Sequence, residues 1–317
     1  MLEGVHPLIL TLAETGEVLR LLNRSGNRPS HDDAAGQVNQ AIWLCMQAGF
    51  RRTVLRGDTD FSQTQHLDRW HELPGVYFIF GYDAMPNMKD LAEGLPATAW
   101  KPLARPARYE VKTQPRQRPD KVKDRIVRER KFDVLRLKSE EVAEFDYRPT
   151  ACKHSYRMVV IRKHISKEKG ERVLFPEVRH FFYITNDREA TAAEIVFEAN
   201  DRCNQENLLA QLHGGVGALQ APVNTLESNG AWMVMTALAW NLKAWWALML
   251  PESPGRWEEQ HREEKRRVLR LEFKGFVSAF VTIPCEVIQT GRRLVLRVLG
   301  WNPHLLTFFR LVSLLRQ

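Results

Sequence analysis

The sequence contains few cysteines and no pattern that would use them. Among its 317 residues the four cysteines, Cys45, Cys152, Cys203 and Cys285, lie far apart and form no C-x-x-C pair. This spacing excludes a disulfide scaffold and argues against a zinc ribbon. The G-x-S-x-G motif and the Cys/His nucleophile signatures of covalent catalysis are missing too.

The sequence also lacks features of secretion or membrane insertion. No basic segment precedes an apolar run near the N-terminus, which argues against a secretory signal. The most apolar stretch, 232–250, is about as long as a membrane span. Lys243 lies in its middle, where insertion would cost about 2.5–3.5 kcal/mol. We therefore predict a buried core helix in a cytoplasmic protein with no membrane partner; a membrane span is the alternative.

Positive charge is concentrated in one segment. The chain carries a formal net charge of +8, whereas residues 101–138 alone hold 14 Lys or Arg and 5 Asp or Glu, a net of +9. Such a local excess favours a nucleic acid or another anionic surface as the partner. The alternative is a solvated loop that binds nothing.

The first hundred residues show the pattern of an α/β fold. Residues 8–22 indicate two strands joined by a tight turn. Ser30 and Asp33 resemble a capping box that opens a helix to about residue 48. A strand at 53–55, a helix at 62–73 and a strand at 76–80 follow, an alternation typical of parallel pairing.

Beyond residue 100 the predicted secondary structure changes twice, first to β-rich and then to helical. Two β-rich runs, 156–162 and 180–185, indicate a β-rich insertion. Thr191 and Glu194 form a second capping box, which predicts a helix to about residue 212, followed by a long helix at 230–249 and a helical tail. We expect four parts: an N-terminal piece of the core (1–100), a basic β-rich insertion (101–185), the helical remainder of the core (186–250) and a C-terminal helical region (251–317).

Asp58 is the first candidate for chemistry. It follows a predicted buried strand, and ligands gather at the carboxyl ends of strands in open α/β sheets. A carboxylate at that edge can bind Mg²⁺, which prefers oxygen ligands. The alternative is that Asp58 or Asp60 only caps the helix that begins near Ser62.

The second candidate is the sequence Arg202-Cys-Asn-Gln-Glu206-Asn. On a helix, Arg202, Glu206 and His213 would share one face. Their side chains could form nothing more than a surface ion pair worth about 0.3–0.5 kcal/mol. The functional alternative is that Glu206 faces Asp58 across a cleft, where both hold metal ions about 3.5–4 Å apart for phosphoryl transfer.

These motifs in this order resemble the DDE transposases of bacterial insertion sequences, in the group with a β-rich insertion between the second and third catalytic acids. The resemblance extends over nearly the whole chain, through segments such as NRSGNRPSH (23–31), RGDTDFSQTQ (56–65), YRMVVIRK (156–163), FFYITN (181–186), NDRCNQEN (200–207), LAWNLKAWW (238–246) and WNP (301–303). It implies an α/β fold with a ribonuclease-H-like mixed sheet, incomplete at its N-terminal strand, a β-rich insertion and a C-terminal helical region.

The resemblance also implies a chemistry. Asp58 and Glu206 would be the second and third catalytic acids and would hold Mg²⁺ or Mn²⁺, while Arg202 would orient Glu206 or contact the phosphate. The partner would be double-stranded DNA, as transposon ends and target, with a possible homodimer on the DNA. The expected DNA-contacting residues are Lys121, Lys123, Arg125, Arg128, Arg130 and His213.

The sequence departs from the family pattern at three points. The first catalytic Asp would lie upstream of Met1, Ala199 replaces a Tyr, and His213 replaces a Lys. We therefore expect an N-terminally truncated transposase with little or no strand-transfer activity. The alternatives are a non-catalytic DNA-binding remnant that modulates an intact transposase, and a stand-alone metal nuclease, which would not need the C-terminal tail.

Overall fold

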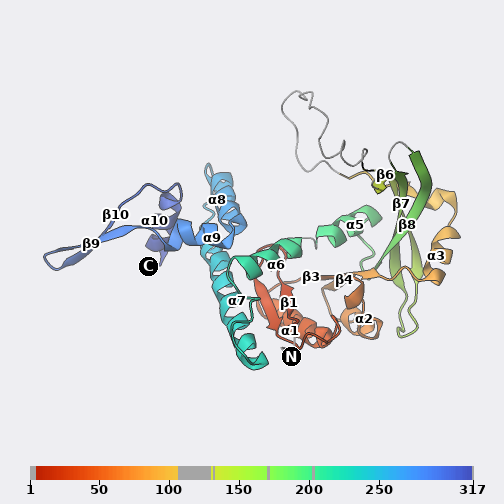
Figure 1. The fold of residues 1–317 in the computed structure, drawn as a ribbon, viewed down its shortest axis with the longest axis horizontal. Coiled ribbons are helices and arrows are strands. Elements are labelled where there is room, and N and C mark those ends of the chain that lie inside the picture. Colours follow the sequence, from red (N-terminus) through yellow and green to blue (C-terminus); the bar gives the residue numbers. More distant parts are fainter. Residues whose placement is uncertain (1–4, 106–129, 131–132, 170–171, 202–203, 316–317) are drawn as a thin grey trace, which may run out of the picture. The chain divides into compact units, whose positions relative to one another are not determined.

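The computed structural model describes residues 5–105, 130, 133–169, 172–201 and 204–315. Its contacts divide the chain into two compact units (Figure 1). Unit 1 comprises residues 1–47 and 203–317, and unit 2 comprises residues 48–202. Each unit is described by itself below. The four-part division expected from the sequence stays a prediction.

Unit 2 is built on a six-stranded mixed sheet with the strand order β3-β4-β8-β7-β6-β5. The strands β3 and β4 are parallel, as the sequence predicts, and β8 pairs with β4 antiparallel. The β-rich segment thus continues the same sheet as β3 and β4. The strands are β3 (Thr53–Gly57), β4 (Val76–Tyr82), β5 (Lys101–Pro102), β6 (Asp133–Tyr147), β7 (Tyr156–Lys169) and β8 (Arg172–Thr185).

Helices cover both faces of this sheet. Successive side chains of a strand point to opposite sides, so neighbouring residues of β4 contact different helices. On one face, Ile79 of β4 packs with Ile195 and Val196 of α5. On the other face, the Phe80 ring lies 5.7 Å from the ring of Trp70 in α2. The helices of unit 2 are α2 (Thr64–His71), α3 (Pro86–Glu93) and α5 (Ala192–Asn200), with short 3₁₀ turns at Thr59–Phe61 and Ala97–Ala99.

Unit 1 combines the N-terminal and C-terminal segments of the chain and contains a β-hairpin. The predicted pair of strands is present as β1 (Leu8–Thr11) and β2 (Val18–Leu22), which are antiparallel. Ile9 and Val18 from the hairpin pack with Leu208, Leu212 and Trp240. The helices are α1 (Ala34–Gln47), α6 (Asn204–Gly214), α7 (Leu226–Leu248), α8 (Glu258–Arg270), α9 (Phe273–Phe276) and α10 (Leu305–Leu314), with a π-helical turn at Val277–Val281.

Several predicted boundaries are wrong. The helix expected from Ser30 begins only at Ala34, because Asp33 has a left-handed backbone (φ 55°) and cannot lie inside a helix. The helix expected over 191–212 is two helices, α5 and α6, separated by residues 201–203. The C-terminal region contains, besides its helices, an antiparallel hairpin of β9 (Cys285–Thr290) and β10 (Arg293–Val298).

The apolar stretch at 232–250 lies in α7 and packs within unit 1. Lys243 is 2% exposed, and its Nζ donates to the carbonyl oxygens of Leu269 (2.9 Å) and Leu271 (2.8 Å). In the described part of the chain, no helix combines the length and apolar character that a membrane crossing requires.

Candidate functional site

Asp58 lies where the sequence places it, directly after β3 at the carboxyl end of the parallel β3–β4 pair. Its side chain is half-buried, and its Oδ1 accepts a 3.2 Å hydrogen bond from the backbone N–H of Asp60. It therefore caps the 3₁₀ turn Thr59–Phe61, whereas α2 begins after Gln63 without a side-chain cap. An ionised carboxylate offers about four acceptor positions, so this cap and metal coordination are compatible.

Two glycines explain why the chain can turn so tightly at Asp58. A Cβ on Gly57 would lie 2.8 Å from Cβ of Phe61, which folds back over the end of β3. A Cβ on Gly81, in the neighbouring strand β4, would lie 3.0 Å from the backbone N of Thr59. The first contact is shorter than real Cβ atoms make, so a side chain on Gly57 would force a shift of the turn. The second contact is tight, so a side chain on Gly81 would require the backbone of Thr59 to move by a few tenths of an ångström.

Arg56 connects the strand that ends at Asp58 with helix α5. Its guanidinium donates a 3.0 Å hydrogen bond to the backbone carbonyl of Glu198, in the last turn of α5. A cation is favourable at a helix C-terminus, where backbone carbonyls lack helical partners. The bond fixes the end of α5 beside β3 within unit 2.

Glu206 and His213 lie in the first and last turns of α6, and both are exposed. The opposite face of α6 is buried through Leu208 and Leu212, which pack against the β1–β2 hairpin. Gln205 donates from Nε2 to the carbonyl oxygen of Ile9 at 3.1 Å and so anchors the start of the helix. Glu206 is thereby presented to solvent on an anchored helix.

The remaining sequence candidates divide between described and undescribed residues. Arg202 and the basic residues Lys121, Lys123, Arg125 and Arg128 lie outside the described residues. Arg130 is described, and it is an exposed turn residue that precedes β6.

The pairing of Asp58 with Glu206 stays a prediction, because the first belongs to unit 2 and the second to unit 1. Among residues that the structure describes, no three His, Cys, Asp or Glu side chains cluster in a way that could hold a metal ion. The chemistry of the two predicted ligands nevertheless suits Mg²⁺ or Mn²⁺, since both are carboxylates. An ion can reach both from solvent, because Glu206 is exposed and Asp58 is only half-buried.

Residues 2–315 match the family model described as transposase DDE domain group 1. The chain is a DDE transposase by family. Its mixed α/β architecture, with the six-stranded mixed sheet and flanking helices, is consistent with the ribonuclease-H-like fold that the resemblance implies. No curated protein matches the chain.

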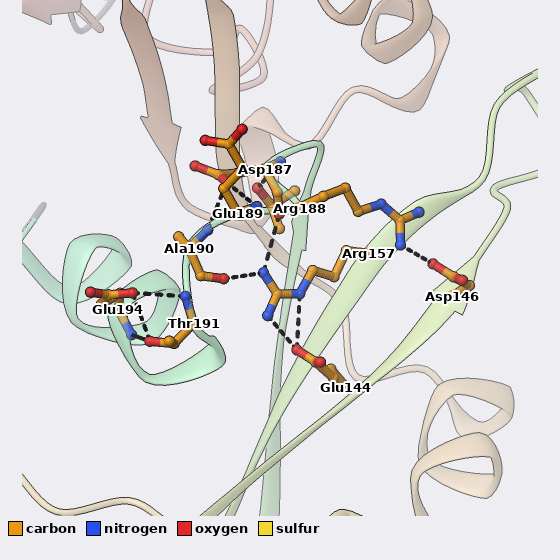
Figure 2. Close-up of polar contacts among 10 residues, drawn as sticks. Glu144, Asp146, Arg157, Asp187, Arg188, Glu189, Ala190, Thr191 and Glu194 are labelled. Carbon is orange, nitrogen blue, oxygen red and sulfur yellow. Dashed lines mark hydrogen bonds and ion pairs between the residues drawn. The ribbon is translucent and has the colours of Figure 1, made fainter.

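Sequence reasoning missed a buried polar network that fixes the transposase sheet to α5 (Figure 2). Asp187, 2% exposed, follows β8, and its Oδ1 accepts the backbone N–H groups of Glu189 (2.9 Å) and Ala190 (3.0 Å). Its Oδ2 accepts a 2.8 Å bond from Arg52. Burial opposes ionisation of Asp187, but these three donors outweigh it and hold the pKa of the carboxyl below its ordinary value.

Arg157 of β7 completes the network from the other side. It is 8% exposed, forms an ion pair with Glu144 of β6, and donates to the carbonyl oxygens of Asp187 and Ala190 (Figure 2). The guanidinium thus ties β6, β7 and the segment that leads into α5. Thr191 then opens α5 with the predicted capping box: its N–H donates to Glu194 Oε2 at 2.7 Å, and its Oγ1 accepts from the Glu194 N–H. Arg157 lies two and four residues before the buried Val159 and Ile161, which places its side chain on the same face of the sheet. Nothing in the sequence identifies its partners.

Proposed function

We propose that the transposase chain acts on DNA by metal-dependent phosphoryl transfer, with Asp58 and Glu206 as two of the carboxylate ligands. Bound Mg²⁺ or Mn²⁺ would supply charge stabilisation at the attacking and leaving oxygens of a phosphodiester. The protein's part is to hold carboxylates where the ions bind. Asp58 suits this role because a capped turn fixes it at the carboxyl end of a parallel strand.

The connection through α5 supports a shared site. Arg56, two residues before Asp58, donates to the backbone carbonyl of Glu198, and Glu206 follows Glu198 by eight positions in the sequence. Eight residues span at most about 28 Å when fully extended. The length of the connecting chain is therefore compatible with a shared site. Arg202, which lies within that connection, would orient Glu206 or contact a phosphate.

A nicking assay tests this function. Supercoiled plasmid is incubated with the purified 317-residue chain and Mn²⁺ or Mg²⁺, and nicked product is measured against Asp58→Asn, Glu206→Gln and the control Asp60→Asn. Asp60 is an exposed carboxylate two residues from Asp58, so it controls for local charge. We expect weak metal-dependent nicking that the first two variants lose and the control keeps. Nicking that survives in both Asp58→Asn and Glu206→Gln would contradict the proposal.

The second candidate function is that of a DNA-binding chain that performs no strand transfer and modulates an intact transposase. The net charge of +9 in residues 101–138 favours it, because binding to phosphates requires only cations. Under this alternative, the chain would shift duplex DNA in a gel yet show no metal-dependent nicking. It would also inhibit end joining by an intact relative in mixed reactions.

DNA binding itself is proposed for Lys121, Lys123, Arg125, Arg128, Arg130 and His213. Each phosphate contact removed should lower the log–log slope of affinity against salt by about 0.9. The fourfold alanine variant at 121, 123, 125 and 128 is compared with Arg262→Ala, whose side chain already pairs with Glu258 on α8. An unchanged slope in the fourfold variant would remove this segment from the DNA interface.

A further inference from the structure

Arg56 of β3 carries a half-buried positive charge that pairs with no carboxylate in the described part of the chain. A guanidinium offers five N–H donors. The structure assigns one of them, from Nη1 to the backbone carbonyl of Glu198 at 3.0 Å. The two other arginines in the described part of unit 2 that are at least half-buried, Arg157 and Arg162, form ion pairs with carboxylates of β6. Arg56 differs from them in having donors that remain available.

Arg56 and Asp58 lie on the same side of β3. Asp58 follows the strand with an extended backbone (φ −81°, ψ −168°), so alternate residues from 56 to 58 share one side. That side is the one covered by α5, because Arg56 lies beside Ile79 of β4, which packs on α5. Gly57 faces the opposite side, where a Cβ would lie 3.1 Å from the Phe80 ring. At the usual rise of a strand, the Cα atoms of Arg56 and Asp58 are about 6–7 Å apart.

The bond to Glu198 does not by itself require an arginine. One donor satisfies one carbonyl oxygen, and a neutral side-chain amide supplies such a donor as well. A guanidinium is planar and can donate to a second acceptor while it keeps the first bond. In a half-buried position its charge is also screened less than it would be on the open surface. The features that distinguish an arginine here, the charge and the additional donors, therefore suit an anionic acceptor near Asp58.

A phosphodiester is the anion that fits this place. Its nonbridging oxygens accept paired hydrogen bonds from a guanidinium, and such charge-assisted bonds are stronger than neutral ones. These oxygens carry the negative charge of the reacting phosphate during phosphoryl transfer, so a donor aimed at them stabilises the transition state. The bond to Glu198 orients the guanidinium before DNA binds, which lowers the cost of ordering a flexible side chain. Arg56 would transfer no proton and form no covalent bond.

We propose that Arg56 is a catalytic residue that donates to a nonbridging oxygen of the phosphodiester bound at Asp58. The proposal rests on the proposed function, because it takes Asp58 as a metal ligand at the reacting phosphate. It assigns a cation of unit 2 to that phosphate, in addition to the role expected of Arg202. Glu198 takes part only through its backbone carbonyl, so the charge of its side chain does not enter the contact.

The primary test measures, by fluorescence anisotropy, how the affinity of the purified chain for a short labelled DNA duplex depends on salt. Arg56→Gln keeps an amide donor for the Glu198 carbonyl but removes the charge, whereas Arg56→Lys keeps the charge. We expect the log–log slope to fall by about 0.9, one phosphate contact, in Arg56→Gln and to stay at the wild-type value in Arg56→Lys. The matched control is Arg51→Gln, at an exposed arginine before the amino end of β3, which should leave the slope unchanged. An unchanged slope in Arg56→Gln, or an equal fall in Arg51→Gln, would overturn the proposal.

Two further measurements separate contact with the phosphate from support of the fold. The urea midpoints of Arg56→Gln and Arg56→Lys should agree, because each variant retains a donor for Glu198. The rate of Mn²⁺-dependent plasmid nicking should fall about 100-fold in Arg56→Gln and less in Arg56→Lys. If both variants lose nicking in proportion to their loss of unfolding midpoint, Arg56 only caps α5 and the proposal is overturned. A wild type that binds the duplex and nicks nothing would contradict the proposed function, and the salt slopes would still decide whether Arg56 contacts a phosphate.

Discussion

The Asp187 network makes a quantitative prediction about stability. Asp187→Ala removes the acceptor of two backbone N–H groups and of one guanidinium bond, in a side chain that is 2% exposed. A buried donor left without a partner costs about 1–3 kcal/mol. Arg52 is half exposed and can turn to water, so it adds little. We expect a loss of about 2–4 kcal/mol, which at typical urea dependences lowers the unfolding midpoint by about 1–2 M.

The assay is urea unfolding followed by circular dichroism, with Asp146→Ala as the control. Asp146 pairs with Arg188 in the same view (Figure 2), but the two side chains are 64% and 51% exposed. An exposed pair contributes about 0–1 kcal/mol. Equal midpoint shifts for the two variants would refute the reasoning that burial decides the cost.

The stability difference between the wild type and Asp187→Ala depends on pH, and the pKa of Asp187 determines its direction. The folded pKa of Asp187 lies below its reference value of 3.8, so the folded state favours the ionised form. The stability it contributes is complete above the unfolded pKa and is lost as the pH falls through the folded pKa. The gap between wild type and Asp187→Ala should thus be constant near neutral pH and narrow below about pH 4. A gap that widens on acidification would contradict the assigned charge state.

Two further predictions concern the turn at Asp58 and the buried lysine. Gly81→Ala should push the backbone of Thr59 away from β4, cost about 1–3 kcal/mol of stability and reduce metal-dependent nicking. Gly275→Ala, whose nearest contact would be an ordinary 4.0 Å, should cost less, and equal losses of stability would contradict the close-approach argument. Burial lowers the pKa of Lys243 to about 8, so the folded state releases a proton that the unfolded state keeps until about pH 10.5. Wild-type stability relative to Lys243→Met should therefore rise between pH 8 and pH 10 in urea titrations, and a fall over that range would contradict the burial of the amine.

The features that the sequence predicts correctly are those that depend on residues close together in the chain. The β1–β2 hairpin, the parallel β3–β4 pair and the Thr191 capping box depend on alternation, turn residues and short-range hydrogen bonds, and all three are present. Asp58 is at its predicted strand end for the same reason.

Most of the features that the sequence does not predict depend on partners that lie far apart in the chain. The break between α5 and α6 is not signalled by apolar spacing, because the buried residues on both of its sides have helical spacing (Ile195 and Val196 before it, Leu208 and Leu212 after it). The late start of α1 at Ala34 has instead a local cause, the left-handed backbone of Asp33. Asp187 and Arg157 meet only after β7 and β8 pair, and the residues between them in sequence give no sign of it. The β9–β10 hairpin was missed because the helical periodicity read over the tail included its apolar residues.

Manganese binding by the purified chain tests most directly whether Asp58 and Glu206 serve one site. Electron paramagnetic resonance measures bound Mn²⁺ for the wild type, Asp58→Asn, Glu206→Gln, the double variant and the Asp60→Asn control. If the two acids share an ion, each single change should weaken binding by about tenfold or more, and the double variant should lose little beyond either single change, because groups that act on one ligand are not additive. Losses that add in the double variant, or single variants that bind Mn²⁺ as the wild type does, would contradict a shared site.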